Sequence, residues 1–195
     1  MKLASKKAVI TGANRSIGQA IAIAFAGEGA DVVISYRSDE EGAQETVKKI
    51  RELGQDAWAI AADFSTETAV KEFYEKALEQ LGQIDILVNN AAGYDTTSYL
   101  DLKFDTFHSL LQVGVMAPML LTQLVARQMK ERNIAGSIIN VSSTSGFSPY
   151  PNRVAHSTAK AGLNMLTQNA ALELAKHRIR VNAIAPGATP YGEEA

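Results

Sequence analysis

The chain has 195 residues, 46% of them hydrophobic, which is enough for one domain, spanning 1–195, around a single buried core. Its 19 basic and 21 acidic residues give a formal net charge of −2, so there is no electrostatic reason to bind nucleic acid or anionic lipid. Cysteine is absent, which excludes disulfides and thiolate metal sites and fits a reducing cytoplasm.

Targeting and membrane signals are also weak. The N-terminal stretch reaches Gly12 after too few apolar residues to form a signal-peptide core. The longest apolar run, "VGVMAPMLL" (113–121), is far shorter than the roughly 18 residues that span a bilayer. The three histidines are scattered along the sequence and indicate no metal site. We therefore expect a cytoplasmic protein without membrane, nucleic-acid or metal partners.

The first half of the chain alternates between strand and helix patterns. A strand is predicted at 7–11, and apolar residues from Ile17 to Phe25 then repeat with the spacing of one helix face. A second strand, 31–36, precedes a helix that Ser38 and Glu41 would begin as a capping box and that ends near Gly54. A third strand, 57–62, leads to a helix over 70–81, which Ser65 or Thr66 can cap.

The second half continues the alternation. A fourth strand is predicted at 84–88 and a long helical region from about Phe104 to Arg132, kinked at Pro118. Strands at 137–142 and 178–185 flank a helix from roughly Asn152 to Ala175. Apolar strands separated by helices predict a doubly wound α/β domain, with a parallel sheet between two helical layers. Ligands bind such sheets beyond the carboxyl ends of the strands.

Candidate binding residues occur at those strand ends. "TGANRSIG" (11–18) joins the first strand to the first helix, where glycines and helix N–H groups can approach a pyrophosphate. Taken with "NNAAG" (89–93), "NVSSTSG" (140–146), a lysine four residues after position 156, and "VNAIAPG" (181–187), this turn resembles the short-chain dehydrogenase/reductase family. The resemblance is to the branch that contains 3-oxoacyl-carrier-protein reductases and glucose dehydrogenases.

The resemblance implies a Rossmann fold that binds a nicotinamide dinucleotide. The glycine turn would hold the pyrophosphate, Asp63 and Phe64 would lie at the adenine, and Pro186, Gly187 and Thr189 at the nicotinamide. Ser16 departs from the glycine that the family has at its position. The full set of candidate cofactor-binding residues is Gly12, Asn14, Arg15, Ser16, Ile17, Gly18, Arg37, Ser38, Asp63, Phe64, Asn90, Ala91, Ala92, Lys160, Pro186, Gly187 and Thr189.

The second strand indicates which nicotinamide is bound. NAD-selective proteins place an acid at its end to bind the ribose hydroxyls. Here the strand reads "VVISYRS", with no acid before Asp39, whereas Arg15 and Arg37 offer two cations that suit a 2′-phosphate. We therefore expect NADP(H).

The resemblance also implies a catalytic set, with two replacements. Ser143 would polarise the substrate carbonyl, and Lys160 would bind the nicotinamide ribose. His156 stands at the position of the family's acid/base tyrosine, and Gly114 at that of an asparagine which supports proton relay. Imidazole can act as an acid or a base near neutral pH, although the adjacent ammonium of Lys160 would favour its neutral form.

Two functions remain open from the sequence. One is an NADP(H)-dependent oxidoreductase acting on a small carbonyl or alcohol. The other is a catalytically silent NADP(H)-binding protein that acts as a sensor or partner subunit. Family members usually continue past "PGATPYGEEA" into another strand, so the sixth strand is expected to form a sheet edge. The resemblance further suggests a dimer or tetramer that packs through the helix with Pro118 and the helix with His156.

Overall fold

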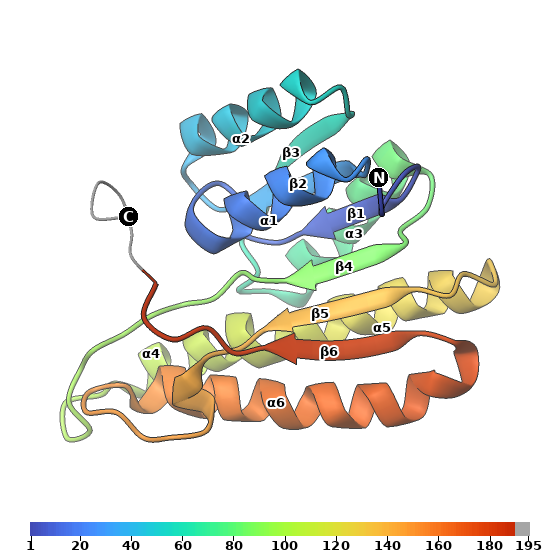
Figure 1. Cartoon of the computed structure of the whole chain (residues 1–195). Coiled ribbons are helices and arrows are strands. Elements are labelled where there is room, and N and C mark those ends of the chain that lie inside the picture. Colours follow the sequence, from blue (N-terminus) through green and yellow to red (C-terminus); the bar gives the residue numbers. More distant parts are fainter. Residues whose placement is uncertain (190–195) are drawn as a thin grey trace.

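Six parallel strands form one sheet in the order β3-β2-β1-β4-β5-β6 in the computed structural model, which describes residues 1–189 (Figure 1). The strands are β1 (Lys7–Ile10), β2 (Asp31–Tyr36), β3 (Ala57–Ala61), β4 (Ile86–Asn89), β5 (Ser137–Val141) and β6 (Arg180–Ile184). The helices are α1 (Ser16–Gly27), α2 (Glu40–Glu52), α3 (Glu67–Leu81), α4 (Phe104–Leu111), α5 (Ala117–Glu131) and α6 (Val154–Leu174). Short turns are η1 (Gln112–Met116), η2 (Thr144–Gly146) and η3 (Ala175–His177).

The strand order confirms the doubly wound Rossmann arrangement. The chain reverses its winding between β3 and β4, and β4 then pairs with β1, so the carboxyl ends of these two central strands lie side by side. This is the switch point at which doubly wound sheets bind ligands. The sixth strand lies at the edge of the sheet, as predicted.

Two hydrophobic layers cover the sheet, because its inner strands are apolar at nearly every position. On one face, α1 and α2 pack through Ala22, Ala26 and Val47. On the other face, α3 and α5 contribute residues such as Phe73 and Val125, and α6 packs along β6. Consecutive side chains of a strand point to opposite faces, so β1 divides its residues between the two layers.

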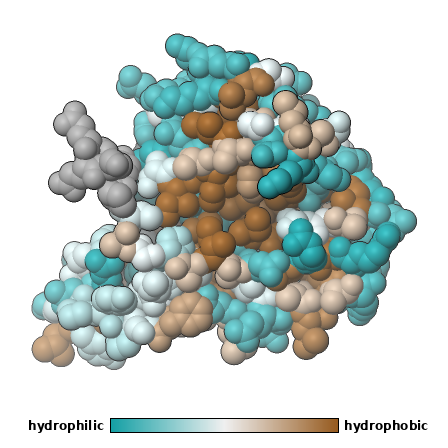
Figure 2. Space-filling view, viewed as in Figure 1, coloured by the Kyte–Doolittle hydropathy of each residue, from teal (hydrophilic) through white to brown (hydrophobic). Residues whose placement is uncertain are grey.

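The α1 side of β5 and β6 has no covering helix among residues 1–189. Figure 2 shows apolar side chains gathered in the middle of this face, over β4 and β5. Ile139 of β5 is only partly buried there, and Ile184 of β6 is 44% exposed. Within residues 1–189, β6 is therefore an edge strand, and a helix covers only one of its two faces.

Several element boundaries differ from the sequence prediction. Asp39, rather than Ser38, caps α2, because its carboxylate accepts the N–H of Gly42. Thr66 caps α3 through the N–H of Ala69. The long helix is interrupted by the π-helical turn η1, and Pro118 lies in the first turn of α5, where its missing N–H is not needed. The predicted kink at Pro118 is thus replaced by an irregularity just before it.

The continuous helical run Phe104–Glu131 is long and apolar enough, by composition alone, to cross a bilayer. Within it, Leu121, Val125 and Met129 are buried in the core beside the sheet. A core helix of a globular domain has these same properties, and we assign the run to the core.

A network of buried, hydrogen-bonded polar side chains connects the sheet to the helices behind the strand ends. Asn89 of β4 donates to Thr122 of α5 at 3.1 Å and to the side-chain oxygen of Asn140 of β5 at 2.8 Å. Asn140 in turn donates to Thr167 of α6 at 2.8 Å. Because every partner is buried and hydrogen-bonded, this side-chain network fixes α5 and α6 relative to the end of the sheet.

Candidate active site

The turn after β1 packs so closely that two of its positions require glycine. Gly12 has a φ of +63°, and a Cβ there would lie 3.0 Å from the Cα of Ala91. A Cβ on Gly18 would lie 2.5 Å from the side-chain nitrogen of Asn90. That same amide donates to the backbone oxygens of Thr11 and Gly12 at 2.8 and 2.9 Å. The glycine turn is therefore held against the end of β4.

The start of α1 has no side-chain cap. Arg15 occupies the capping position without a side-chain hydrogen bond to the helix, and the first turn holds no acidic residue. Asp39 and Thr66, by contrast, cap the starts of α2 and α3. First-turn amides carry partial positive charge and have no partner within their helix, so the start of α1 suits a pyrophosphate.

Ser16 adopts an unusual backbone conformation at this helix start. Its φ is +52°, in the left-handed region where a side chain clashes with the backbone and where glycine has no such penalty. The conformation explains why the related family has glycine at this position. Serine at this position keeps the same left-handed backbone conformation, and the strain of that conformation lowers the stability of the folded protein.

Charged groups surround the same turn. Arg15 and Arg37 are both exposed, the second immediately after β2. Asp39 uses both carboxylate oxygens within the protein: one accepts from Gly42 at 3.0 Å and the other from the side chain of Asn14 at 2.8 Å. The hydrogen bond from Gly42, together with Asn14 and the nearby Arg15, lowers the pKa of Asp39. Asp39 therefore caps α2 and, through Asn14, is hydrogen-bonded to the turn after β1.

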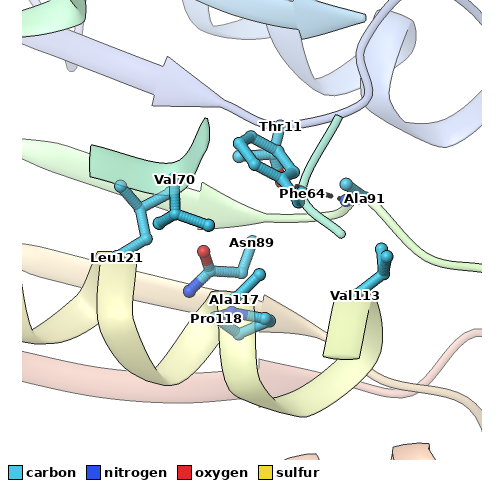
Figure 3. A pocket seen from close by; sticks show the side chains of 9 residues that line it. All are labelled: Thr11, Phe64, Val70, Asn89, Ala91, Val113, Ala117, Pro118 and Leu121. Carbon is cyan, nitrogen blue, oxygen red and sulfur yellow. Dashed lines mark hydrogen bonds between the residues drawn. The ribbon is translucent and has the colours of Figure 1, made fainter. Parts of the chain in front are cut away.

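At the expected adenine-binding position, the side chain of Phe64 lies differently from the prediction. Asp63 is exposed after β3, and its carboxylate accepts the N–H of Ser65 at 3.1 Å. The side chain of Phe64 turns into the core, where it meets Phe73 edge to face at a centroid distance of 5.2 Å. Figure 3 shows Phe64 pointing into a small pocket with Asn89, Val113 and other core residues. Phe64 can therefore reach a cofactor only through its backbone.

Lys160 is buried at the end of β5. Its side-chain nitrogen donates to the backbone oxygen of Val141 at 2.6 Å, and the residue is only 4% exposed. Burial lowers the pKa of Lys160 from 10.5 to about 8. No ion pair with residues 1–189 compensates this charge, and its other N–H groups have no hydrogen-bond partner among them. Such an ammonium is well suited to bind the hydroxyls of a ribose.

His156 lies one turn before Lys160 on the same face of α6. Its Nδ1 is 3.2 Å from the backbone oxygen of Gly93. A carbonyl oxygen can only accept, so Nδ1 carries the proton, and the neutral ring keeps its lone pair on Nε2. Burial lowers the pKa of His156; Lys160 and Arg153 act in the same direction, and the hydrogen bond to Gly93 opposes them. The expected neutral form is thus present, with burial rather than Lys160 as the main cause.

Ser143 follows β5 and begins the turn η2. Its hydroxyl oxygen accepts from the N–H and the hydroxyl of Ser145, at 3.2 and 2.9 Å, which leaves its own proton available to donate. The turn is packed against the helix at Lys160, since a Cβ on Gly146 would lie 2.9 Å from the carbonyl carbon of Lys160. Thr144 also donates to the backbone oxygen of Pro186 at 3.1 Å, which connects the turn to the segment after β6.

Gly114 sits in η1, buried against α6. A Cβ at this position would lie 3.0 Å from the Cβ of Ala159, the residue before Lys160. The position at which the related family has asparagine is therefore tightly packed in this protein, and η1 contributes no polar side chain there.

An aromatic and cationic cluster next to His156 was not predicted. The ring of Tyr94 meets that of His156 edge to face at 5.3 Å. The guanidinium of Arg153 lies 4.9 Å from the centre of the Tyr94 ring and 6.0 Å from that of Tyr150. Two sequence signals pointed toward it: Tyr94 lies in the segment 94–103, which the sequence places at the substrate pocket, and Arg153 lies one helical turn before His156.

The predicted residues thus gather at the carboxyl ends of the central strands. The glycine turn, Asn90, Ala91 and Ala92 lie at the ends of β1 and β4, and the catalytic candidates lie after β5 and on α6. Gly187 and Thr189 follow β6 and are exposed. No group of three or more histidine, aspartate or glutamate side chains within 1–189 is arranged to hold a metal ion.

Comparisons with known protein families and sequences agree with the family that the sequence motifs resemble. The family model described as short chain dehydrogenase matches residues 6–191. The chain is 40% identical over 195 residues to 3beta-hydroxysteroid dehydrogenase 1 of Eggerthella lenta, covering 98% of this chain and 74% of that protein.

Two solved structures are closely similar. A short chain dehydrogenase from Burkholderia cenocepacia in complex with NADP has a TM-score of 0.92 and 35% identity, over 98% of this chain and 77% of that one. An NAD⁺-bound xylitol dehydrogenase also has a TM-score of 0.92, with 33% identity, over 98% of this chain and 74% of that one.

Proposed function

This chain belongs to the short-chain dehydrogenase family, and we propose that it is an NADP(H)-dependent oxidoreductase that interconverts a small alcohol and the corresponding carbonyl compound. The observation that carries the proposal is the buried, uncompensated ammonium of Lys160, on one helix face with His156 and in contact with the turn of Ser143. A buried charge is costly unless it is paired, so a site that keeps an unpaired one is a candidate functional site.

The residues present fit a nicotinamide dinucleotide. The uncapped start of α1 would hold the pyrophosphate, and Lys160 would donate to the nicotinamide ribose. When bound, this group supplies or accepts the hydride. The protein side chains then have to position the substrate oxygen and move its proton.

His156 and Ser143 divide those two tasks. The Nε2 lone pair of neutral His156 can take the proton of a substrate alcohol, which makes His156 a general base. The hydroxyl proton of Ser143 can donate to the same substrate oxygen as it becomes a carbonyl. Carbonyl reduction would instead need the imidazolium, which burial and two cations disfavour. Alcohol oxidation near neutral pH therefore starts from the protonation state of His156 that its lowered pKa favours, and it is the direction that we propose to assay.

The choice of NADP(H) over NAD(H) rests on the end of β2. Arg37 follows this strand and Arg15 lies at the start of α1; both are exposed, and both carboxylate oxygens of Asp39 are already hydrogen-bonded within the protein. Among the similar structures, one binds NADP and another NAD⁺, so the preference needs a direct test. We expect NADPH to bind more tightly than NADH by fluorescence titration. The variant Arg37→Gln should weaken NADPH binding about 10- to 100-fold, as loss of a charge-assisted hydrogen bond implies, and leave NADH binding unchanged. Equal binding of both by wild type would refute the preference.

Turnover decides between an enzyme and a silent binding protein. NADP⁺ reduction at 340 nm is measured with a panel of secondary alcohols and sugars, for wild type, Ser143→Ala, His156→Gln and His156→Tyr. An enzyme that uses His156 loses activity in His156→Gln, and wild type is at least as active as His156→Tyr. Activity in His156→Tyr alone would mean that the fold is competent but the natural protein is silent. NADPH binding without turnover by any variant would favour the sensor or partner-subunit alternative.

We also propose a cytoplasmic homo-oligomer, a dimer or tetramer, that packs through α5 and α6. Apolar side chains on these helices and the preceding turn are exposed, with exposed fractions of 50% for Met116, 41% for Met119, 57% for Met165 and 79% for Leu172. Apolar patches on helices are common at subunit interfaces. Light scattering after gel filtration tests this; the double variant Met165→Glu with Leu172→Glu should yield monomers, and a monomeric wild type would contradict it.

A further inference from the structure

Arg153 occupies a defined place beside the proposed general base. It lies three residues before His156, and Tyr94 fills the space between them. The guanidinium lies over the Tyr94 ring at 4.9 Å and near Tyr150 at 6.0 Å. Aromatic rings attract a cation through their faces, so two rings hold this guanidinium next to the reaction centre without neutralising its charge.

The hydrogen-bonding groups of the Arg153 guanidinium are unused within residues 1–189. No hydrogen bond or ion pair joins its guanidinium to any of residues 1–189. A cation–π contact uses the charge of the guanidinium and leaves the five N–H groups in its plane able to donate to an oxygen. That planar fork matches the two oxygens of a carboxylate or phosphate. Arg153 is only half-buried, so a ligand can reach it.

The charges around His156 point to the same class of ligand. Lys160 and Arg153, both cations, are the charged groups that act on the imidazole, and no carboxylate of the described chain does so. A neutral substrate would leave both charges uncompensated beside it. An anionic substrate would be attracted to this site and would pair with the Arg153 guanidinium, which has no ion-pair partner in the part of the chain that the structure describes.

We propose that Arg153 is a substrate-binding residue that selects alcohols or carbonyl compounds bearing a carboxylate or phosphate within a few bonds of the reacting carbon. This inference rests on the proposed function, because it places the reacting carbon at His156. It goes beyond that function by naming the charge class of the substrate. The Arg153–Tyr94 cluster would hold the anionic end while His156 faces the hydroxyl.

The test compares matched pairs of alcohols that differ only in charge. NADP⁺ reduction is measured with lactate and methyl lactate, 3-hydroxybutyrate and its methyl ester, and glycerol 3-phosphate and glycerol. In parallel, binding of oxamate and of inorganic phosphate to the NADPH-saturated protein is measured by calorimetry. The variants are Arg153→Gln, which removes the charge at similar length, and Arg153→Lys, which keeps the charge but loses the fork. Arg127→Gln, on the exposed side of α5, is the matched control.

We expect wild type to prefer the anionic member of at least one pair by tenfold or more in kcat/KM. Arg153→Gln should abolish that preference and weaken binding of the matching anion about 10- to 100-fold, with Arg153→Lys between the two and Arg127→Gln like wild type. The preferred pair distinguishes carboxylate from phosphate.

Four outcomes would count against the proposal or separate it from the proposed function. Equal use of charged and neutral alcohols, or a preference that survives in Arg153→Gln, would overturn it. Turnover of neutral alcohols alone would support the proposed function and refute this inference. If no alcohol reacts, the proposed function fails, and anion binding still decides: binding lost in Arg153→Gln upholds an anion site, and no binding removes it.

Discussion

Lys160 should make the stability of this protein depend on pH in an alkaline range. Burial lowers its pKa from 10.5 in the unfolded chain to about 8 in the folded protein. Between these two pH values the unfolded chain binds more protons than the folded protein, so the free energy of unfolding rises with pH across this range. Below pH 8 the buried ammonium imposes its full cost, and above about pH 10.5 the cost is gone.

The size of this effect follows from the same pKa difference. At about 1.4 kcal/mol per pKa unit, a lowering from 10.5 to about 8 corresponds to roughly 3 kcal/mol. The variant Lys160→Met removes the titrating group and keeps an unbranched side chain. Its loss of the hydrogen bond to Val141 is present at every pH and cancels in a comparison across pH. The difference in unfolding free energy between wild type and variant should therefore shift by about 3 kcal/mol in favour of wild type as the pH rises.

Urea unfolding measures this shift directly. The single tryptophan, Trp58 in β3, reports unfolding by fluorescence at pH 7.5, 8.5, 9.5 and 10.5 without cofactor. With a urea dependence of about 2 kcal/mol per molar, the gap between the two midpoints should change by roughly 1.5 M. The exposed Lys130→Met is the control and should show no such change. A wild type–variant gap that stays constant with pH would refute the argument that Lys160 is buried without compensation.

Three further predictions follow from individual residues. The kcat/KM for alcohol oxidation should rise through one ionisation below pH 6.5, because His156 must be neutral to act as base, and stay level until Lys160 begins to lose its proton at about pH 8; a rise centred near pH 10 would point to a tyrosine instead. Ser16→Gly should stabilise the protein by about 1 kcal/mol in thermal or urea unfolding, because it removes a left-handed non-glycine residue, whereas Ser16→Ala should not. Gly114→Asn should lower the free energy of unfolding by about 1–3 kcal/mol, because the larger side chain overpacks the contact with Ala159. Adding Ala159→Gly should recover part of that loss. An unchanged midpoint of urea unfolding in Gly114→Asn would show that the neighbouring residues move aside at little cost.

The general architecture was predictable because it depends on local patterns. Each inner strand is a short apolar run, and each helix repeats its apolar residues at helical spacing, so the parallel sheet and its layers followed from the sequence. The glycine turn and the order of motifs also placed the candidate site at the ends of β1, β4 and β5. Boundaries were less certain, since Ser38 and Asp39 are both good helix caps and only the approach of the Gly42 N–H selects Asp39.

The chemistry of the site depended on contacts between distant parts of the chain. Which ring nitrogen of His156 keeps its lone pair follows from which one meets the backbone oxygen of Gly93, a residue 63 positions away. The inward turn of Phe64 follows from the space beside Phe73, and the tight packing at Gly114 from the approach of Ala159. None of these is encoded in a local pattern, because each depends on how whole elements pack.

The sequence by itself determined the fold, the family resemblance and the candidate residues, since spacing and residue type report directly on strand, helix and turn preferences. Only the tertiary structure decided which nitrogen of His156 is protonated, how strongly burial acts on Lys160, and that the Arg153 guanidinium lies over Tyr94 without a hydrogen-bond or ion-pair partner in the described chain. These properties are electrostatic and steric. They depend on the distance to neighbours and the loss of water, and the folded arrangement sets both.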